Sequence, residues 1–224
     1  MNQRLIAQYS SIEAQNRDKF LQNQLDLDTT WGKSIWGMTL QIDLGEEVKD
    51  QIAKYQKDLE ELESGNLLLL PRELQHISFN QVVFWGGEYK LGTEGTWNSI
   101  SEVFLSAFKG LDNLYSPFTV TFSKLIATTG GIIWCATDEN DELENLRNEF
   151  LAKLPFPPET TKLNHIIHTT IARYKNKLNH PRRVTEYISS HSESVPMKVD
   201  QIILKKELVF PTIKTEEIAK ISLK

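Results

Sequence analysis

Two histidines of the chain each stand two positions before a hydroxyl side chain. The segment HISF contains His76 and Ser78, and the segment HTTI contains His168 and Thr170. Side chains alternate between the two faces of a strand, so residues two apart share a face. An imidazole and a hydroxyl on one face can hold a phosphate group and exchange a proton with it. These four residues are therefore the first candidates for chemistry.

Two such pairs suit the cleavage of a phosphodiester. That reaction needs a base for the attacking water and an acid for the departing oxygen, and histidine, with an unperturbed pKa of about 6.5, can be either near neutral pH. Neighbouring hydroxyls can donate hydrogen bonds to the phosphate oxygens. The chemistry requires no metal, and we expect neither a metal nor a cofactor. The sequence does not indicate which histidine is the base.

A single histidine of this kind is more often a structural residue. Catalysis is favoured because the pair of a histidine and a hydroxyl occurs twice. His165 offers a second interpretation, because His165 and His168 have the H-x-x-H spacing of some zinc ligands. On a strand, however, residues three apart face opposite sides. We therefore expect His165 to be structural.

The motifs depend on elements that carry them to one site. Alternating or β-branched apolar residues predict strands, and apolar spacings of three and four predict helices. The expected strands are 36–44, 74–85, 117–127, 132–138, 164–174 and 197–210. The expected helices are 46–63, 97–111, 139–154 and 181–192. The polar start of the chain is loosely helical, so we divide the chain into an N-terminal helical extension, residues 1–35, and a domain, residues 36–224.

The expected elements repeat once over a long period. Gly37 to His76 spans 39 positions and Gly131 to His168 spans 37, each through strand, helix and strand. Both helices end 14 residues before their histidine. The matched order indicates two similar lobes that each contribute one equivalent strand to a site.

The paired motifs resemble the His-x-Ser/Thr motifs of the two-histidine (2H) phosphoesterase superfamily, and HTTIAR is similar to its second motif, in which Ala and Arg often follow. The resemblance covers residues 36–210. It implies that His76 and His168 are catalytic and that Ser78 and Thr170 hold the phosphate. It also implies an α+β fold with two pseudo-symmetric lobes, whose antiparallel sheets line a central cleft and whose helices lie outside.

The resemblance further implies a hydrolase that acts on phosphodiester bonds. The expected substrates are a cyclic nucleotide, an RNA end with a 2′,3′-cyclic phosphate, or a 2′-5′-linked oligonucleotide. Two other functions stay open. One is a relative that ligates RNA or transfers a phosphate. The other is a protein that binds a nucleotide without turnover, as a sensor or sequestering protein does.

Basic and aromatic residues follow the second motif. In RYKNKLNHPRR, Arg173 and Tyr174 come directly after HTTIA, and we expect both to contact substrate. The remaining basic residues are either a solvated turn or an electrostatic collar for a phosphorylated ligand. Trp85 and Tyr89 lie near the end of the first motif strand and are candidates for stacking on a base, although packing is the commoner role for such residues.

Composition restricts the partners. The 224 residues carry a net charge of −5, which argues against wrapping long duplex nucleic acid and leaves a nucleotide or short RNA as the expected partner. The single cysteine, Cys135, forms no intramolecular disulfide and is expected to be buried and inert. The sequence shows neither a membrane span nor a secretion signal, so we expect a cytoplasmic protein. It does not indicate the oligomeric state.

Overall fold

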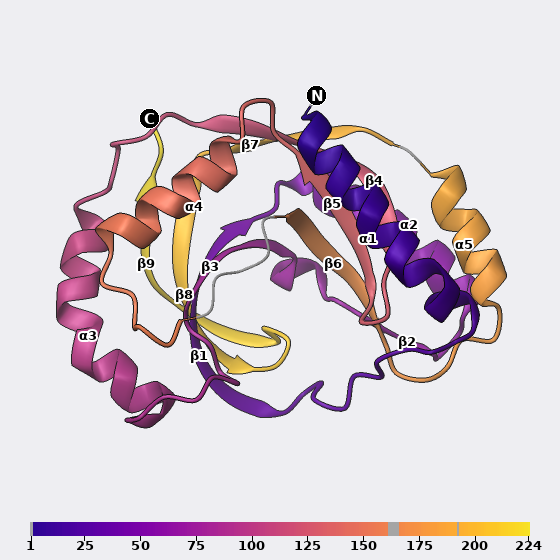
Figure 1. Ribbon diagram of the computed structural model, residues 1–224, viewed down its shortest axis with the longest axis horizontal. Helices are drawn as coiled ribbons and strands as arrows, with labels where there is room; N and C mark the ends of the chain where they lie inside the picture. The colour runs from indigo at the N-terminus through magenta and orange to yellow at the C-terminus, as the bar shows by residue number, and fades with distance from the viewer. Residues whose placement is uncertain (1, 161–165, 192) are drawn as a thin grey trace.

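Two antiparallel sheets form the centre of the molecule (Figure 1). The computed structural model describes residues 2–160, 166–191 and 193–224. The four-stranded sheet has the order β3 (His76–Val83), β1 (Ser34–Asp43), β8 (Gln201–Val209), β9 (Lys214–Ser222). The five-stranded sheet has the order β2 (Leu67–Leu69), β6 (Ile167–Tyr174), β5 (Ile132–Thr137), β4 (Phe118–Ala127), β7 (Val195–Val199). The predicted α+β fold with two antiparallel sheets is confirmed.

The two sheets have matching strand orders. The order β3-β1-β8-β9 corresponds to β6-β5-β4-β7, and β2 is added at the edge beside β6. The two motif strands, β3 and β6, therefore occupy equivalent positions, and they contact each other between the sheets. The predicted pair of pseudo-symmetric lobes is thus present in the strand topology.

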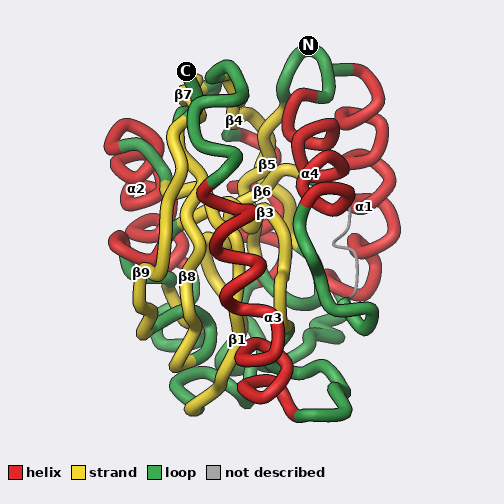
Figure 2. The backbone as a smooth tube through the Cα atoms, turned by 90° about the vertical axis from the view of Figure 1, so that its left-hand side faces the viewer, coloured by secondary structure: helices red, strands yellow, loops and turns green. Residues whose placement is uncertain are grey.

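The helices lie outside the sheets, as predicted. On the four-stranded sheet lie α3 (Gly92–Lys109), which Figure 2 shows in front of the strands, and α4 (Glu142–Lys153). On the five-stranded sheet lie α1 (Gln3–Leu21), α2 (Glu46–Leu62) and α5 (Pro181–Ser190), which Figure 1 shows at the opposite side.

Two of these helices are exchanged between the lobes. Helix α2 follows β1 of the four-stranded sheet, yet its Tyr55 ring packs edge-on against Trp134 of β5, with centroids 5.2 Å apart. Helix α4 follows β5 of the five-stranded sheet, yet its Phe150 packs against Phe79 of β3 at 4.9 Å. All four rings are buried. Each lobe therefore completes the hydrophobic core of the other.

The predicted N-terminal extension, residues 1–35, contains α1, and this helix shares the main core. Leu5, Tyr9 and Phe20 are buried on it. The Tyr9 hydroxyl donates to the Ala136 carbonyl of β5 at 2.5 Å and accepts from the N–H of Ile167 in β6 at 3.1 Å. Helix α1 thus supports the outer side of the strand that carries the second motif.

Three strands differ from the sequence prediction. The expected strand 197–210 is wrong as one element, because β7 and β8 are separate strands on either side of Asp200 and belong to different sheets. Strands β2 and β9 were not predicted. The leucine run before Pro71 has no alternation that would distinguish a short edge strand. In β9, charged residues interrupt the apolar pattern that predicts a strand.

Each motif strand contains a β-bulge directly after its hydroxyl residue. The pairing of β3 with β1 skips Phe79, and the pairing of β6 with β5 skips Ile171. An extra residue of this kind moves the following side chains to the opposite face of the strand. The residue five positions after each histidine, Gln81 or Arg173, therefore lies on the same face as that histidine.

Glycines lie opposite both bulged segments. A Cβ on Gly131 of the loop before β5 would lie 2.5 Å from the Ala172 carbonyl oxygen, closer than real Cβ contacts allow. A Cβ on Gly37 of β1 would lie 3.2 Å from the Val83 carbonyl oxygen. The long-period repeat of strand, helix and strand begins at these two glycines in the sequence. In each lobe the glycine allows the backbone of a neighbouring strand to approach closely.

The bulge of β3 is held by an arginine from the other lobe. Arg147 lies on α4 and is buried. Its Nε donates to the Phe79 carbonyl at 2.8 Å, and its two terminal nitrogens donate to the carbonyls of Ser78 and Ile166. One guanidinium therefore fixes the bulge after the first motif and the backbone that enters β6.

The bulge of β6 is likewise held by a side chain of the other lobe. Gln56 of α2 donates through Nε2 to the Ile171 carbonyl at 2.9 Å and to the Leu70 carbonyl at 2.8 Å. Gln56 precedes its own lobe's histidine by 20 residues, and Arg147 precedes its own by 21. The two exchanged helices are therefore equivalent supports of the two motif strands.

Arg147→Met is expected to destabilise the protein by several kcal/mol, because it leaves buried carbonyl groups unpaired at about 1–3 kcal/mol each. Gln56→Leu, which removes two neutral hydrogen bonds, is expected to cost about 1–3 kcal/mol. Denaturant unfolding measures both changes. The matched control is Arg183→Met at an exposed position of α5, with an expected change within about 0.5 kcal/mol. Equal midpoints for Arg147→Met and Arg183→Met would contradict this account of the bulge.

Candidate active site

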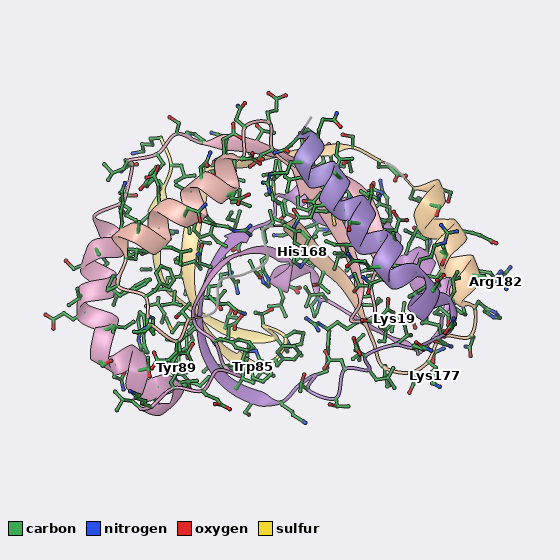
Figure 3. All side chains as sticks on the ribbon, viewed as in Figure 1. Lys19, Trp85, Tyr89, His168, Lys177 and Arg182 are labelled. Atoms are coloured by element: carbon green, nitrogen blue, oxygen red, sulfur yellow. The ribbon has the colours of Figure 1, made fainter. Side chains whose placement is uncertain are left out.

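A cavity of about 380 Å³ lies between the two motif strands. One part of its wall is polar and consists of His76 and Ser78 from β3 with His168 and Thr170 from β6. The other part is formed by aromatic rings that follow β3 and β8, namely Phe84, Trp85 and Phe210. Figure 3 shows His168 near the middle of the molecule and Trp85 below it.

The first motif fixes the orientation of its imidazole. The Nδ1 of His76 lies 2.7 Å from the Leu74 carbonyl oxygen, which requires a proton on Nδ1. The Nε2 therefore faces the cavity side, 3.4 Å from the Ser78 Oγ. Burial lowers the pKa of His76, an effect that the hydrogen bond to Leu74 opposes. The charges of Lys205 and Asp43 act on this pKa in opposite directions.

The second motif holds a more strongly perturbed imidazole. Burial lowers the pKa of His168 to about 4, and the positive charges of Arg147, His76 and Arg173 add to the shift. His168 is therefore neutral near pH 7, with a ring nitrogen available to accept a proton. Arg147, which supports the bulge of β3, therefore also contributes to the electrostatic potential at His168.

Arg173 is the one arginine that lines the cavity in the described part of the chain. The bulge at Ile171 brings it to the face of His168. Its guanidinium lies 5.0 Å above the Phe210 ring and 3.6 Å from a carboxylate oxygen of Asp28, a residue of the N-terminal segment. These contacts orient a positive charge along the cavity wall, where it can pair with a phosphate.

Tyr174 lies on the other face and does not line the cavity. Its hydroxyl donates to the Thr128 carbonyl at 3.0 Å, and its ring packs against Phe20 of α1 with centroids 6.1 Å apart. The structure thus brings together five of the six residues singled out from the sequence, and it gives Tyr174 a packing role. Of the two stacking candidates, Trp85 lines the cavity, whereas Tyr89 is buried and its hydroxyl accepts from the Phe84 N–H at 2.8 Å.

Several cavity residues were not predicted. Gln81 and Phe84 follow Ser78 at steps of three, and only the bulges of β3 place them on its face. Glu207 projects from β8, a strand without a motif. A sequence signal did exist for Arg147, because it occupies the same helical stripe as the apolar residues of α4.

The other basic residues after the second motif lie away from the cavity. Lys175, Lys177, Arg182 and Arg183 are exposed, and Figure 3 shows Lys177 and Arg182 at the outer edge of the molecule. They form a solvated surface beside α5 and do not form a collar around the cavity. Cys135 is fully buried, and burial raises the pKa of its thiol, as expected for an inert cysteine.

Within residues 2–160, 166–191 and 193–224 there is no group of three His, Cys, Asp or Glu side chains arranged to hold a metal ion. His165, the partner in the zinc interpretation, lies outside the described residues. None of the helices in the described part of the chain combines the length and apolar character of a membrane span.

Solved structures with the same fold share little sequence with this chain. TT0787 of Thermus thermophilus is 15% identical, with a TM-score of 0.56 over 84% of this chain and 97% of its own. LigT of E. coli complexed with 3′-AMP is 12% identical, with a TM-score of 0.56 over 85% of this chain and 99% of its own. A protein described as a phosphoesterase is 12% identical, with a TM-score of 0.54 over 85% and 99%.

Sequence comparison alone finds no counterpart. No family model matches the chain, and no curated protein matches it significantly. The likeness therefore lies in the arrangement of the strands and helices. This chain has the fold of the two-histidine (2H) phosphoesterases, as its paired motifs predicted.

Proposed function

We propose that this protein is a metal-independent phosphodiesterase that hydrolyses a nucleotide substrate by acid–base catalysis with two histidines. The observation that carries the proposal is the convergence of His76, Ser78, His168 and Thr170 from two equivalent strands on one cavity. The LigT structures complexed with 3′-AMP, ATP and phosphate support a nucleotide phosphate as the ligand class. A 2′,3′-cyclic phosphate or a 2′-5′ linkage is the proposed bond.

The electrostatics suggest a division of roles. His168 is neutral near pH 7 and suits the base that takes a proton from the attacking water. His76 suits the acid, because the Leu74 carbonyl stabilises its Nδ1–H and a bound phosphate anion favours the imidazolium form. Its Nε2 then donates a proton to the leaving oxygen.

The remaining polar groups act on the phosphate itself. The hydroxyls of Ser78 and Thr170 donate hydrogen bonds to non-bridging oxygens from opposite walls, and the charge of Arg173 offsets the negative charge that develops during attack. The rings of Phe84, Trp85 and Phe210 provide an apolar surface for the base. The cavity thus has a polar part for the phosphate and an aromatic part for the nucleoside.

His76→Ala and His168→Ala are each expected to lower kcat by a factor of about 10² to 10⁴, because each removes one proton-transfer group. The assay uses 2′,3′-cyclic nucleotides, 3′,5′-cyclic nucleotides and 2′-5′-linked oligoadenylates with EDTA present, and chromatography separates hydrolysis from ligation or transfer. His180→Ala, at an exposed position before α5, is the control and should retain full activity. Turnover that survives both substitutions would exclude this mechanism, and tight binding without product would indicate a nucleotide-binding protein.

The low pKa of His168 makes stability depend on pH. The unfolded chain takes up this proton at about pH 6.5 and the folded protein at about pH 4, so the folded state loses stability as the pH falls through this window. Lowering the pH from 7 to 5 is expected to cost about 2 kcal/mol through His168. Urea unfolding at both pH values, compared between the wild type and His168→Ala, isolates this contribution. An identical pH dependence in the two proteins would contradict a depressed pKa.

A further inference from the structure

We infer that Glu207 is a specificity-determining residue that reads the hydrogen-bonding edge of the base of the bound nucleotide. The inference deepens the proposed function and rests on it, since it requires a nucleotide phosphate at the two histidines. Glu207 is the one carboxylate side chain that lines the cavity in the described part of the chain. Its location, its hydrogen bonds and its lack of a cationic partner support the assignment.

Glu207 lies between the phosphate-binding part and the aromatic part of the cavity. On β1, Gln41 pairs with Ser78 of β3, and Gly37 pairs with Glu207 of β8. Gln41 lies four positions after Gly37, a distance of about 13 Å at 3.3 Å per residue. The Gln41 and Glu207 side chains meet along this interval, because the Gln41 Nε2 donates to the Glu207 Oε1 at 3.2 Å.

The aromatic surface begins beside the same carboxylate. A Cβ on Gly37 would lie 3.4 Å from the Glu207 Oε2 and 3.4 Å from the Trp85 Cβ. Trp85 in turn packs against Phe210, with ring centroids 5.1 Å apart. The glycine therefore leaves the space in which the carboxylate lies next to Trp85. A base that stacks on these rings presents its polar edge towards Glu207.

The carboxylate has no cation to neutralise it among the described residues. No ion pair of the described chain includes Glu207, although the residue is only 9% exposed. Its immediate partners are the uncharged side chains of Thr39 and Gln41 on β1. On its own strand, the neighbouring Lys205 and Lys206 pair with Asp43 and Glu216. A buried acid without a counter-ion is costly, and a ligand that donates hydrogen bonds to it recovers that cost.

The protonation state of Glu207 decides which base it accepts. Burial raises the pKa of Glu207 to about 7, against the effect of the hydrogen bonds from Thr39 and Gln41. An ionised carboxylate only accepts, and guanine is the common base with two adjacent donors, N1–H and N2–H, for its two oxygens. A neutral carboxyl donates once and accepts once, which also suits N1 and N6–H of adenine. Guanine preference should therefore rise as the pH passes through about 7.

Other titrating groups affect both bases alike. The charged or titratable groups that line the cavity from the opposite strands are His76 of β3 and His168 and Arg173 of β6. These groups form the part of the cavity assigned to the phosphate, and that phosphate is the same in every nucleotide compared. In the ratio of the affinities for two nucleotides, the contribution of the groups around the phosphate therefore cancels. The ratio then reports the contribution of the residues that contact the base.

The test is calorimetric binding of 3′-GMP and 3′-AMP to the wild type at pH 5.5 and 8.5, where product analogues avoid turnover. The ratio of the AMP to the GMP dissociation constant is expected to rise about tenfold, which corresponds to about 1.4 kcal/mol. Glu207→Gln, which keeps the shape and stays neutral, should give a ratio that does not change with pH. The exposed Glu47→Gln on α2 is the matched control and should behave as the wild type.

Two results would overturn the inference in distinguishable ways. In the first, the ratio of the AMP to the GMP dissociation constant stays constant with pH in the wild type, or rises equally in Glu207→Gln. This result would exclude Glu207 as the base-reading residue and would leave the phosphodiesterase proposal unaffected. Failure of both nucleotides to bind at either pH would reject the nucleotide site, and the inference with it.

Discussion

The site depends on two backbone bulges that are each held by a helix of the opposite lobe. A bulge exposes carbonyl groups that the neighbouring strand no longer pairs, and a buried carbonyl without a donor is unfavourable. Arg147 of α4 donates to the Ser78 and Phe79 carbonyls at the bulge of β3. Gln56 of α2 donates to the Ile171 carbonyl at the bulge of β6, which also accepts from the Leu70 N–H at 3.2 Å. Because each helix follows a strand of the other lobe, the backbone shape of each motif strand depends on contacts between the two lobes.

The same constraint sets the chemistry of the cavity. The bulges bring Gln81 and Arg173 to the face of the two histidines. Burial keeps the His168 imidazole neutral, and the charge of the buried Arg147 adds to this effect. One buried guanidinium therefore contributes to the backbone geometry of the first motif and to the proton affinity of the second. The lobes are equivalent in topology, and this charge contributes to the difference between their two histidines.

The sequence predicted the features that depend only on neighbouring residues of one strand. A histidine and a hydroxyl two positions apart share a face whatever lies around them, so the four central residues follow from alternation alone. Alternation fails beyond the bulge, because it would place Tyr174 on the face of His168, where the structure has Arg173. Each bulge is stabilised by hydrogen-bond donors on a distant helix. The residue pattern of the strand itself does not reveal these donors. Glu207 likewise gains its position from pairing between distant strands.

The most direct test of the division between base and acid is the titration of both imidazoles by NMR, without and with bound 3′-AMP. We expect His168 to stay neutral from pH 5 to pH 8 in the free protein, and we expect the nucleotide to raise the pKa of His76 so that it becomes an imidazolium near neutral pH. Titration of His168 near pH 6.5, with no response of His76 to the nucleotide, would exclude these roles for the two histidines.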